Sequence, residues 1–182
     1  MLRLPELREH QRLLVTGDRA IEGRGSTPAL GVLPDSVAMD LPFKRLDPGA
    51  ALPERAHPGD AGLDLRSVAE LVVEPGERAM VPTGLAVAIP DGYAGLVLPR
   101  SGLASRQGLT LANAPGLIDA GYRGEVVCAV VNLDRSEPVK IARGDRIAQL
   151  VIVAVPDVRG VVVDQLPDST RGAGGFGSTG TR

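Results

Sequence analysis

The sequence predicts an all-β fold, a β-sandwich or jelly-roll, on the strength of two observations. The first is composition, because the 182 residues include 23 Gly and 15 Pro but only 2 Phe, 2 Tyr and no Trp. The core must therefore be built from aliphatic, often β-branched side chains, with frequent turns between them. The second is pattern, because short strand-forming runs alternate with turn clusters from Leu41 onward. Many short strands with Gly and Pro turns are typical of sandwiches and jelly-rolls.

The expected strands are short and closely spaced, and the turns EPGE, IPDGY, DRSEP and ARGD separate several of them. The first convincing strand is LPFKRL, which begins at Leu41. The further expected strands cover residues 62–65, 70–73, 78–81, 85–89, 94–99, 109–112, 125–133, 139–141, 146–155 and 161–163. Helical periodicity is expected only for a single turn around residues 103–106.

Three regions differ in composition. Residues 1–38 contain a short helical pattern at 6–14 and then many turn formers without a sustained period, so we expect a disordered N-terminal extension. Met39 directly precedes the first strand, which raises the hypothesis that the natural start lies there and that the extension is a start-site artefact. Residues 39–166 form the β domain, and the Gly-rich residues 167–182 form a flexible C-terminal arm.

Charge and cysteine content exclude several classes of function. The formal net charge is -2 and the basic residues are scattered among acids, so neither nucleic acid nor a membrane surface is an expected partner. Cys128 is the single cysteine and lies in the apolar run EVVCAVVNL, which predicts a buried structural thiol and excludes an intramolecular disulfide. No apolar run is long enough to span a bilayer, and MLRLPELREHQRLL is too charged for a signal sequence. We therefore expect a soluble, cytoplasmic protein.

The stretch NAPGLIDAGYRGE, residues 113–125, carries one acid, Asp119, among several glycines. This composition predicts a tight β-hairpin whose backbone approaches a ligand closely. The amide of Asn113 and the exposed main chain offer the donors and acceptors that read the edge of a pyrimidine, with Tyr122 as the pocket wall. The alternative is an ordinary surface hairpin with one solvated Asp.

Two stretches suggest a site for phosphates and a metal ion. In HPGDAGLDLRS, Asp60 and Asp64 flank a Gly, and a carboxylate there suits an outer-sphere contact to Mg²⁺, although such a stretch alone is more often just a turn. In PRSGLASRQGL, Arg100, Ser101 and the following amides suit a phosphate, helped by the start of a helical turn.

Two further stretches have a structural as well as a functional interpretation. Gln149 in RGDRIAQLVI lies in a strongly apolar strand, where a neighbouring loop is the usual partner for its amide. The glycines of RGAGGFGSTG, residues 171–180, suit a phosphate but are also typical of a flexible tail. An ordinary P-loop NTPase is excluded, because the Lys before the Ser or Thr is missing and no strand-to-helix context surrounds the motif.

Together, in order and spacing, these five stretches closely resemble the five motifs of trimeric dUTPases, over roughly residues 41–179. The resemblance implies a jelly-roll-like β-barrel and a homotrimer whose active sites are built by all three subunits. The implied reaction is Mg²⁺-assisted hydrolysis of dUTP to dUMP and pyrophosphate, which keeps uracil out of DNA and supplies dUMP for dTMP synthesis.

The resemblance also implies a role for each matching residue. Asp119 resembles the acid that orients the attacking water, Asp64 the outer-sphere holder of Mg²⁺ through water, and Tyr122 the ring that packs under deoxyribose. The implied phosphate-binding residues are Arg100, Ser101, Gly102 and Gln149; the implied uracil-binding residues are Asn113, Gly116, Leu117, Ile118, Asp119 and Val127. The implied C-terminal lid consists of Arg171, Phe176, Gly177, Ser178 and Thr179.

Two alternatives remain at this point. A dCTP deaminase has a similar fold and triphosphate site but acts on C4 of the base, for which the Asp119 and Tyr122 pattern fits less well. A non-catalytic nucleotide-sensing or protein-binding module would keep the fold and pocket, but all the expected acidic and basic groups are retained here.

Overall fold

The computed structural model describes residues 39–170, 172 and 173. The predicted N-terminal extension and most of the predicted arm lie outside the described residues. The described residues form ten strands and one helix: β1 (Phe43–Arg45), β2 (Leu63–Arg66), β3 (Leu71–Val73), β4 (Arg78–Val87), β5 (Tyr93–Pro99), α1 (Ser101–Gln107), β6 (Leu109–Leu111), β7 (Gly116–Ile118), β8 (Glu125–Asn132), β9 (Val139–Ile141) and β10 (Arg146–Ala154).

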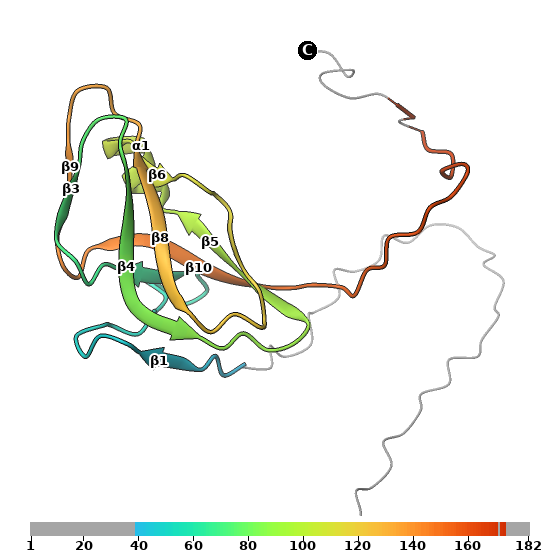
Figure 1. Ribbon diagram of the computed structural model, residues 1–182, viewed down its shortest axis with the longest axis horizontal. Coiled ribbons are helices and arrows are strands. Elements are labelled where there is room, and N and C mark those ends of the chain that lie inside the picture. Colours follow the sequence, from blue (N-terminus) through green and yellow to red (C-terminus); the bar gives the residue numbers. More distant parts are fainter. Residues whose placement is uncertain (1–38, 171, 174–182) are drawn as a thin grey trace, which may run out of the picture. The chain divides into compact units, whose positions relative to one another are not determined.

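Two four-stranded antiparallel sheets make up the domain, with strand orders β1-β4-β8-β6 and β2-β10-β5-β7. The long strands β4 and β8 lie side by side in the first sheet, and β3 and β9 form a separate two-stranded ribbon (Figure 1). The predicted all-β architecture is confirmed.

One aliphatic core joins the two sheets. It contains Leu65 and Leu150 from one sheet and Val81 and Val130 from the other, all fully buried. In β8 buried residues alternate with half-buried ones, which is the period of two that a strand with one face on a core requires. This core supplies a rigid base for the loops that carry the polar motifs.

Strand β4 combines two runs that the sequence predicts as separate strands, 78–81 and 85–89. A β-bulge interrupts its pairing with β8 between Pro82 and Ala86. At the bulge the Thr83 hydroxyl donates to the Val126 carbonyl oxygen at 2.6 Å, and the Gly84 amide donates to the Glu125 carboxylate at 2.7 Å. These side chains replace ladder hydrogen bonds, so the strand continues through a region that resembles a turn in sequence.

The prediction of a strand at residues 161–163 is wrong. The three valines there are exposed and pair with none of the described strands. A β-branched run forms a strand only when a neighbour supplies the hydrogen-bonding ladder, and the described part of this chain supplies none.

The helical turn predicted at residues 103–106 is confirmed and is longer than expected. Helix α1 covers Ser101–Gln107 and ends at Gly108, whose φ of 68° is the left-handed conformation that commonly terminates helices. No helix in the described part of the chain is long and apolar enough to cross a membrane.

Candidate active site

The loop between β7 and β8 connects the two sheets. Strand β7 pairs with β5 and not with β8, which pairs with β4 and β6, so the predicted tight hairpin is wrong. A turn remains, because the Tyr122 amide donates to the Asp119 carbonyl oxygen at 3.0 Å. One physical reason is length, because β7 has only three residues, whereas β4 gives β8 a ladder from Glu125 to Val131. The two strands diverge and leave a pocket of about 160 Å³ between them.

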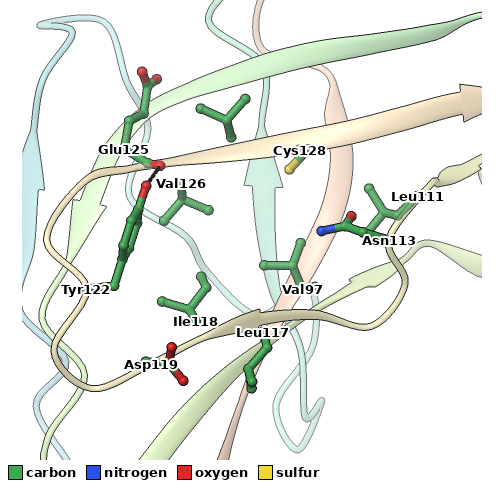
Figure 2. Close-up of a pocket in the computed structure, with 12 residues that line it drawn as sticks. Val97, Leu111, Asn113, Leu117, Ile118, Asp119, Tyr122, Glu125, Val126 and Cys128 are labelled. Carbon is green, nitrogen blue, oxygen red and sulfur yellow. Dashed lines mark hydrogen bonds between the residues drawn. The ribbon is translucent and has the colours of Figure 1, made fainter.

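Figure 2 shows this pocket, with Asn113 at one end and with Asp119 and Tyr122 at the other. Its apolar surface comes from core side chains such as Val97, Ile118 and Val126. Of the sequence-predicted residues, the following line the pocket: Asn113, Gly116, Leu117, Ile118, Asp119, Tyr122 and Val127. The structure therefore brings the whole predicted uracil-binding set together.

The backbone on both sides of the pocket is incompletely paired. Strand β7 is at the end of its sheet, with β5 as its neighbour on one side. In β8 the ladder with β6 involves residues 130–132, and Ala112 extends it to Ala129, so residues 125–128 have no described strand beside them on the β6 side. Free N–H and C=O groups bordering an apolar slot suit a flat ring with donors and acceptors along its edge.

Tyr122 forms a wall of the pocket. Its hydroxyl donates to the Glu125 carbonyl oxygen at 2.8 Å, and the residue is 45% exposed. A side chain at Gly124 would obstruct this arrangement, because its Cβ would lie 2.5 Å from the Tyr122 hydroxyl oxygen. Sequence reasoning missed Glu125, whose carboxylate on Gly84 attaches the start of β8 to the β4 bulge. Its position as the first residue of the predicted strand was the available signal.

Cys128 also lines the pocket, but it is buried and burial raises the pKa of its thiol to about 12. Because the thiolate is the nucleophilic form, this residue does not act as a nucleophile at neutral pH. The predicted structural thiol is confirmed.

A second polar cluster lies around Asp64. One carboxylate oxygen contacts Arg100 Nε at 3.0 Å, and the other contacts Arg146 Nη1 at 3.0 Å. The Asp64 side chain is only 14% exposed. Sequence reasoning identified Asp64 and Arg100 but missed Arg146. The contact between Arg146 and Asp64 depends on the pairing of β2 with β10, which brings together residues far apart in the chain.

Gln149 belongs to the same cluster. It lies directly opposite Asp64 in the β2–β10 pair, and its side-chain amide donates to the Pro99 carbonyl oxygen at 3.0 Å. The partner of this amide is the last residue of β5 and not a loop, and the place of Gln149 beside Asp64 puts it near the predicted phosphate site. Gly62 permits this packing, because a Cβ there would lie 2.4 Å from Gln149 Oε1.

Ser101 and Gly102 begin helix α1, immediately after Arg100. Ser101 is exposed, and Gly102 lies against the guanidinium of Arg106, 2.8 Å from where its Cβ would be. The predicted phosphate set, Arg100, Ser101, Gly102 and Gln149, therefore gathers around the junction of β5, α1 and β10.

The two clusters do not meet within one chain. The pocket that contains Asp119 is lined by neither Asp64, Arg100 nor Gln149. The predicted lid residues Arg171, Phe176, Gly177, Ser178 and Thr179 lie outside the described residues.

A model of the dUTPase family matches residues 49–180. The chain belongs to the dUTPase family. Curated relatives agree, among them the deoxyuridine 5'-triphosphate nucleotidohydrolase of Thermobifida fusca, 56% identical over 86% of this chain and 87% of that protein. The enzyme of the same name from Streptomyces avermitilis is 56% identical over 78% of this chain and 81% of that enzyme.

Solved dUTPase structures share the fold of this family member. The dUTPase of Staphylococcus bacteriophage 80alpha with dUPNHPP superposes with a TM-score of 0.74 at 35% identity, covering 79% of this chain and all of that one. A mutant dUTPase from phage phi11 of S. aureus, described with a structural Mg(II) ion, gives a TM-score of 0.67 at 32% identity over 71% of this chain and all of that one.

Proposed function

We propose that the protein hydrolyses dUTP to dUMP and pyrophosphate. The observation that carries this proposal is the slot between β7 and β8, where two open backbone edges, Asn113 and an apolar floor border a space with Asp119 at one end. Membership of the dUTPase family points to the same reaction. Such an enzyme keeps uracil out of DNA and supplies dUMP for dTMP synthesis, and we propose that it works in the cytoplasm.

In this proposal Asp119 acts as a general base. Its exposed carboxylate accepts a proton from a water that attacks the α-phosphorus in line with the leaving pyrophosphate. Asn113 and the backbone of Gly116, Leu117, Ile118 and Val127 read the uracil edge. The Tyr122 ring packs under deoxyribose and leaves no room for a 2′-hydroxyl.

The triphosphate is bound by Arg100, Ser101, Gly102 and Gln149, which cluster at the start of α1. Two guanidiniums on one carboxylate give the Asp64 cluster a net positive charge, which supports this role. We further propose that Arg171, Phe176, Gly177, Ser178 and Thr179 close over the bound nucleotide, with Phe176 over uracil and Arg171 with the hydroxyls on the γ-phosphate.

Mg²⁺ is the proposed cofactor. The described residues contain no group of three or more His, Cys, Asp or Glu side chains that would cage a metal ion. The Asp64 carboxylate would suit Mg²⁺ that is held mainly by phosphates and water, because its oxygens have lone pairs beyond those used by the two arginines and could accept a hydrogen bond from a water on the ion. When bound, the ion neutralises charge on the triphosphate.

We propose a homotrimer with shared active sites. Two observations support it: the Asp119 pocket and the Asp64 cluster are separate in one chain, and an apolar segment is exposed. In that segment Val158, Val161 and Val162 have relative exposures of 79%, 70% and 102%. Such side chains favour burial against another subunit.

The test is incubation with dUTP, dCTP, dTTP and UTP in the presence of Mg²⁺, with pyrophosphate and ammonia quantified. The proposal expects pyrophosphate from dUTP and little turnover of the other three. Ammonia from dCTP would instead indicate the deaminase alternative, and tight nucleotide binding without turnover would indicate a sensing module.

A further inference from the structure

We propose that Arg146 is a positioning residue: it fixes the Asp64 carboxylate, and Asp64 in turn fixes the guanidinium of Arg100 for the triphosphate. This inference rests on the proposed function, because it assumes that Arg100 contacts phosphate. No direct contact between Arg146 and substrate is required.

The first argument is the geometry of the carboxylate. Arg100 and Arg146 bind different oxygens of Asp64, each at 3.0 Å. With one arginine bound, the Asp64 carboxylate can still rotate about its Cβ–Cγ bond. Two ion pairs on different oxygens restrict that rotation. The Asp64 side chain is 14% exposed, so these contacts are only partly screened by water.

The second argument concerns which donors of Arg100 remain free. Its Nε is used by Asp64, and its Nη1 donates to the main-chain carbonyl oxygen of Arg146 at 3.2 Å. Among the described residues no side chain or carbonyl oxygen pairs with Nη2 of Arg100. Arg146 therefore holds Arg100 through both its backbone and, by way of Asp64, its side chain, while leaving part of the guanidinium for a phosphate oxygen.

The third argument is that the strand is shaped to place Arg146 there. In a regular strand Ile147 would share a face with Gln149, but the β2–β10 register shifts between Arg146 and Ala148. Ile147 and Ala148 are consequently both buried, and Arg146 lies with Gln149 on the partly exposed side. A β-bulge beside a site commonly redirects a side chain in this way.

Arg143 provides a matched control. It lies three residues earlier, and it also forms an ion pair with an aspartate, with its Nη2 2.6 Å from Asp47 Oδ1. It has no contact with Asp64 or Arg100 among the described residues. Arg143→Met therefore removes a comparable arginine without touching the proposed relay.

The experiment measures dUTP turnover and binding of the imido analogue of dUTP for wild type, Arg146→Met, Arg146→Lys and Arg143→Met, with folding checked by thermal melting. Arg146→Met is expected to lower kcat about tenfold or more, the scale of one charge-assisted hydrogen bond. Arg146→Lys should recover part of that loss, because an ammonium still contacts Asp64 as a point charge. Arg143→Met should match wild type.

The decisive measurement is the same Arg146→Met change in an Asp64→Asn background, read by both turnover and analogue affinity. If Arg146 acts through Asp64, the second change should add less than about twofold. A full, independent loss there would overturn the inference, as would wild-type turnover in Arg146→Met. If Arg146→Met does not fold, a Lys variant that shows no coupling to Asp64→Asn overturns it equally. A wild-type protein that releases no pyrophosphate from dUTP would instead refute the proposed function.

Discussion

Tyr122 donates its phenolic hydrogen bond to the main-chain carbonyl oxygen of Glu125 at 2.8 Å. The Glu125 carboxylate accepts the Gly84 amide at 2.7 Å, so the ring is attached through β8 to the bulge of β4. The wall of the pocket is therefore held by the protein itself before any ligand arrives, which reduces the entropy lost on binding.

Tyr122→Ala is expected to increase activity on UTP relative to dUTP by roughly tenfold or more, because removing the ring opens the space that a 2′-hydroxyl needs. The measurement is kcat/KM for both nucleotides. Tyr122→Phe is the control: it loses the bond to Glu125, worth about 1 kcal/mol, but keeps the ring, so selectivity should persist. Equal selectivity in all three proteins would show that the sugar is selected elsewhere.

Asp119→Asn is expected to lower kcat by about 10²- to 10⁴-fold while dUTP affinity changes little, since an amide keeps the shape but does not accept the proton of the attacking water. Single-turnover kinetics check the expected fall in kcat, and equilibrium binding of the imido analogue checks that affinity changes little. A loss well below tenfold would contradict the role of general base.

Deleting residues 171–182 should leave the melting temperature of the protein nearly unchanged and remove most activity. This segment, RGAGGFGSTGTR, contains a single large apolar side chain and so contributes little to a core, yet it holds the Arg, Phe and hydroxyl groups proposed to close the site. A truncated protein with wild-type turnover would contradict the lid.

Shared sites predict rescue between subunits. Mixing Asp119→Asn subunits with truncated subunits, by unfolding and reassembly, should create sites that combine an intact Asp119 with an intact arm from another chain. Neither parent forms such a site if the arm serves a neighbour. Confirmed mixed oligomers without recovered activity would show that each arm serves its own subunit.

Cys128 should make stability fall at alkaline pH. Its pKa is raised by burial from 9.0 to about 12, so above pH 9 the unfolded chain loses a proton that the folded protein retains. The contribution of the Cys128 thiol to the free energy of unfolding is complete below pH 9. It is lost as pH rises toward 12, at about 1.4 kcal/mol per pH unit. Denaturant unfolding at pH 8 and pH 10 should show this loss for wild type but not for Cys128→Ala; parallel losses would contradict it.

The sequence was sufficient for the fold class and for part of the pocket lining. Aliphatic runs between turn residues indicated most of the strands, and the residues predicted to bind uracil line one pocket. The predictions that failed were those that depend on which strands pair with each other. The valines at 161–163 lack a paired neighbour, and the Gly-rich turn after β7 suggested local pairing although β4 and β5 are the actual neighbours.

Arg146 illustrates the same limit at the level of chemistry. Nothing in RGDRIAQLVI shows which face of the strand Arg146 occupies, because the answer depends on a bulge. In the β2–β10 pair Arg146 lies opposite Arg66 and Gln149 opposite Asp64, and the side chain of Arg146 still reaches Asp64, with Nη1 3.0 Å from Oδ2. Local sequence therefore shows which charged side chains are present. Which of them form ion pairs is known only from the three-dimensional structure.

In the proposed function, a nucleotide base bound in this pocket would take the place of a neighbouring strand. The free edge of β7 and the open part of β8 are the kind of surface on which another polypeptide can add itself, which is how sheets aggregate. Here β7 is only three residues long, so its edge has too few hydrogen-bonding groups to pair with another strand over any length but enough for one small ring. A molecule with its pocket filled therefore presents less open backbone to its neighbours than one with its pocket empty.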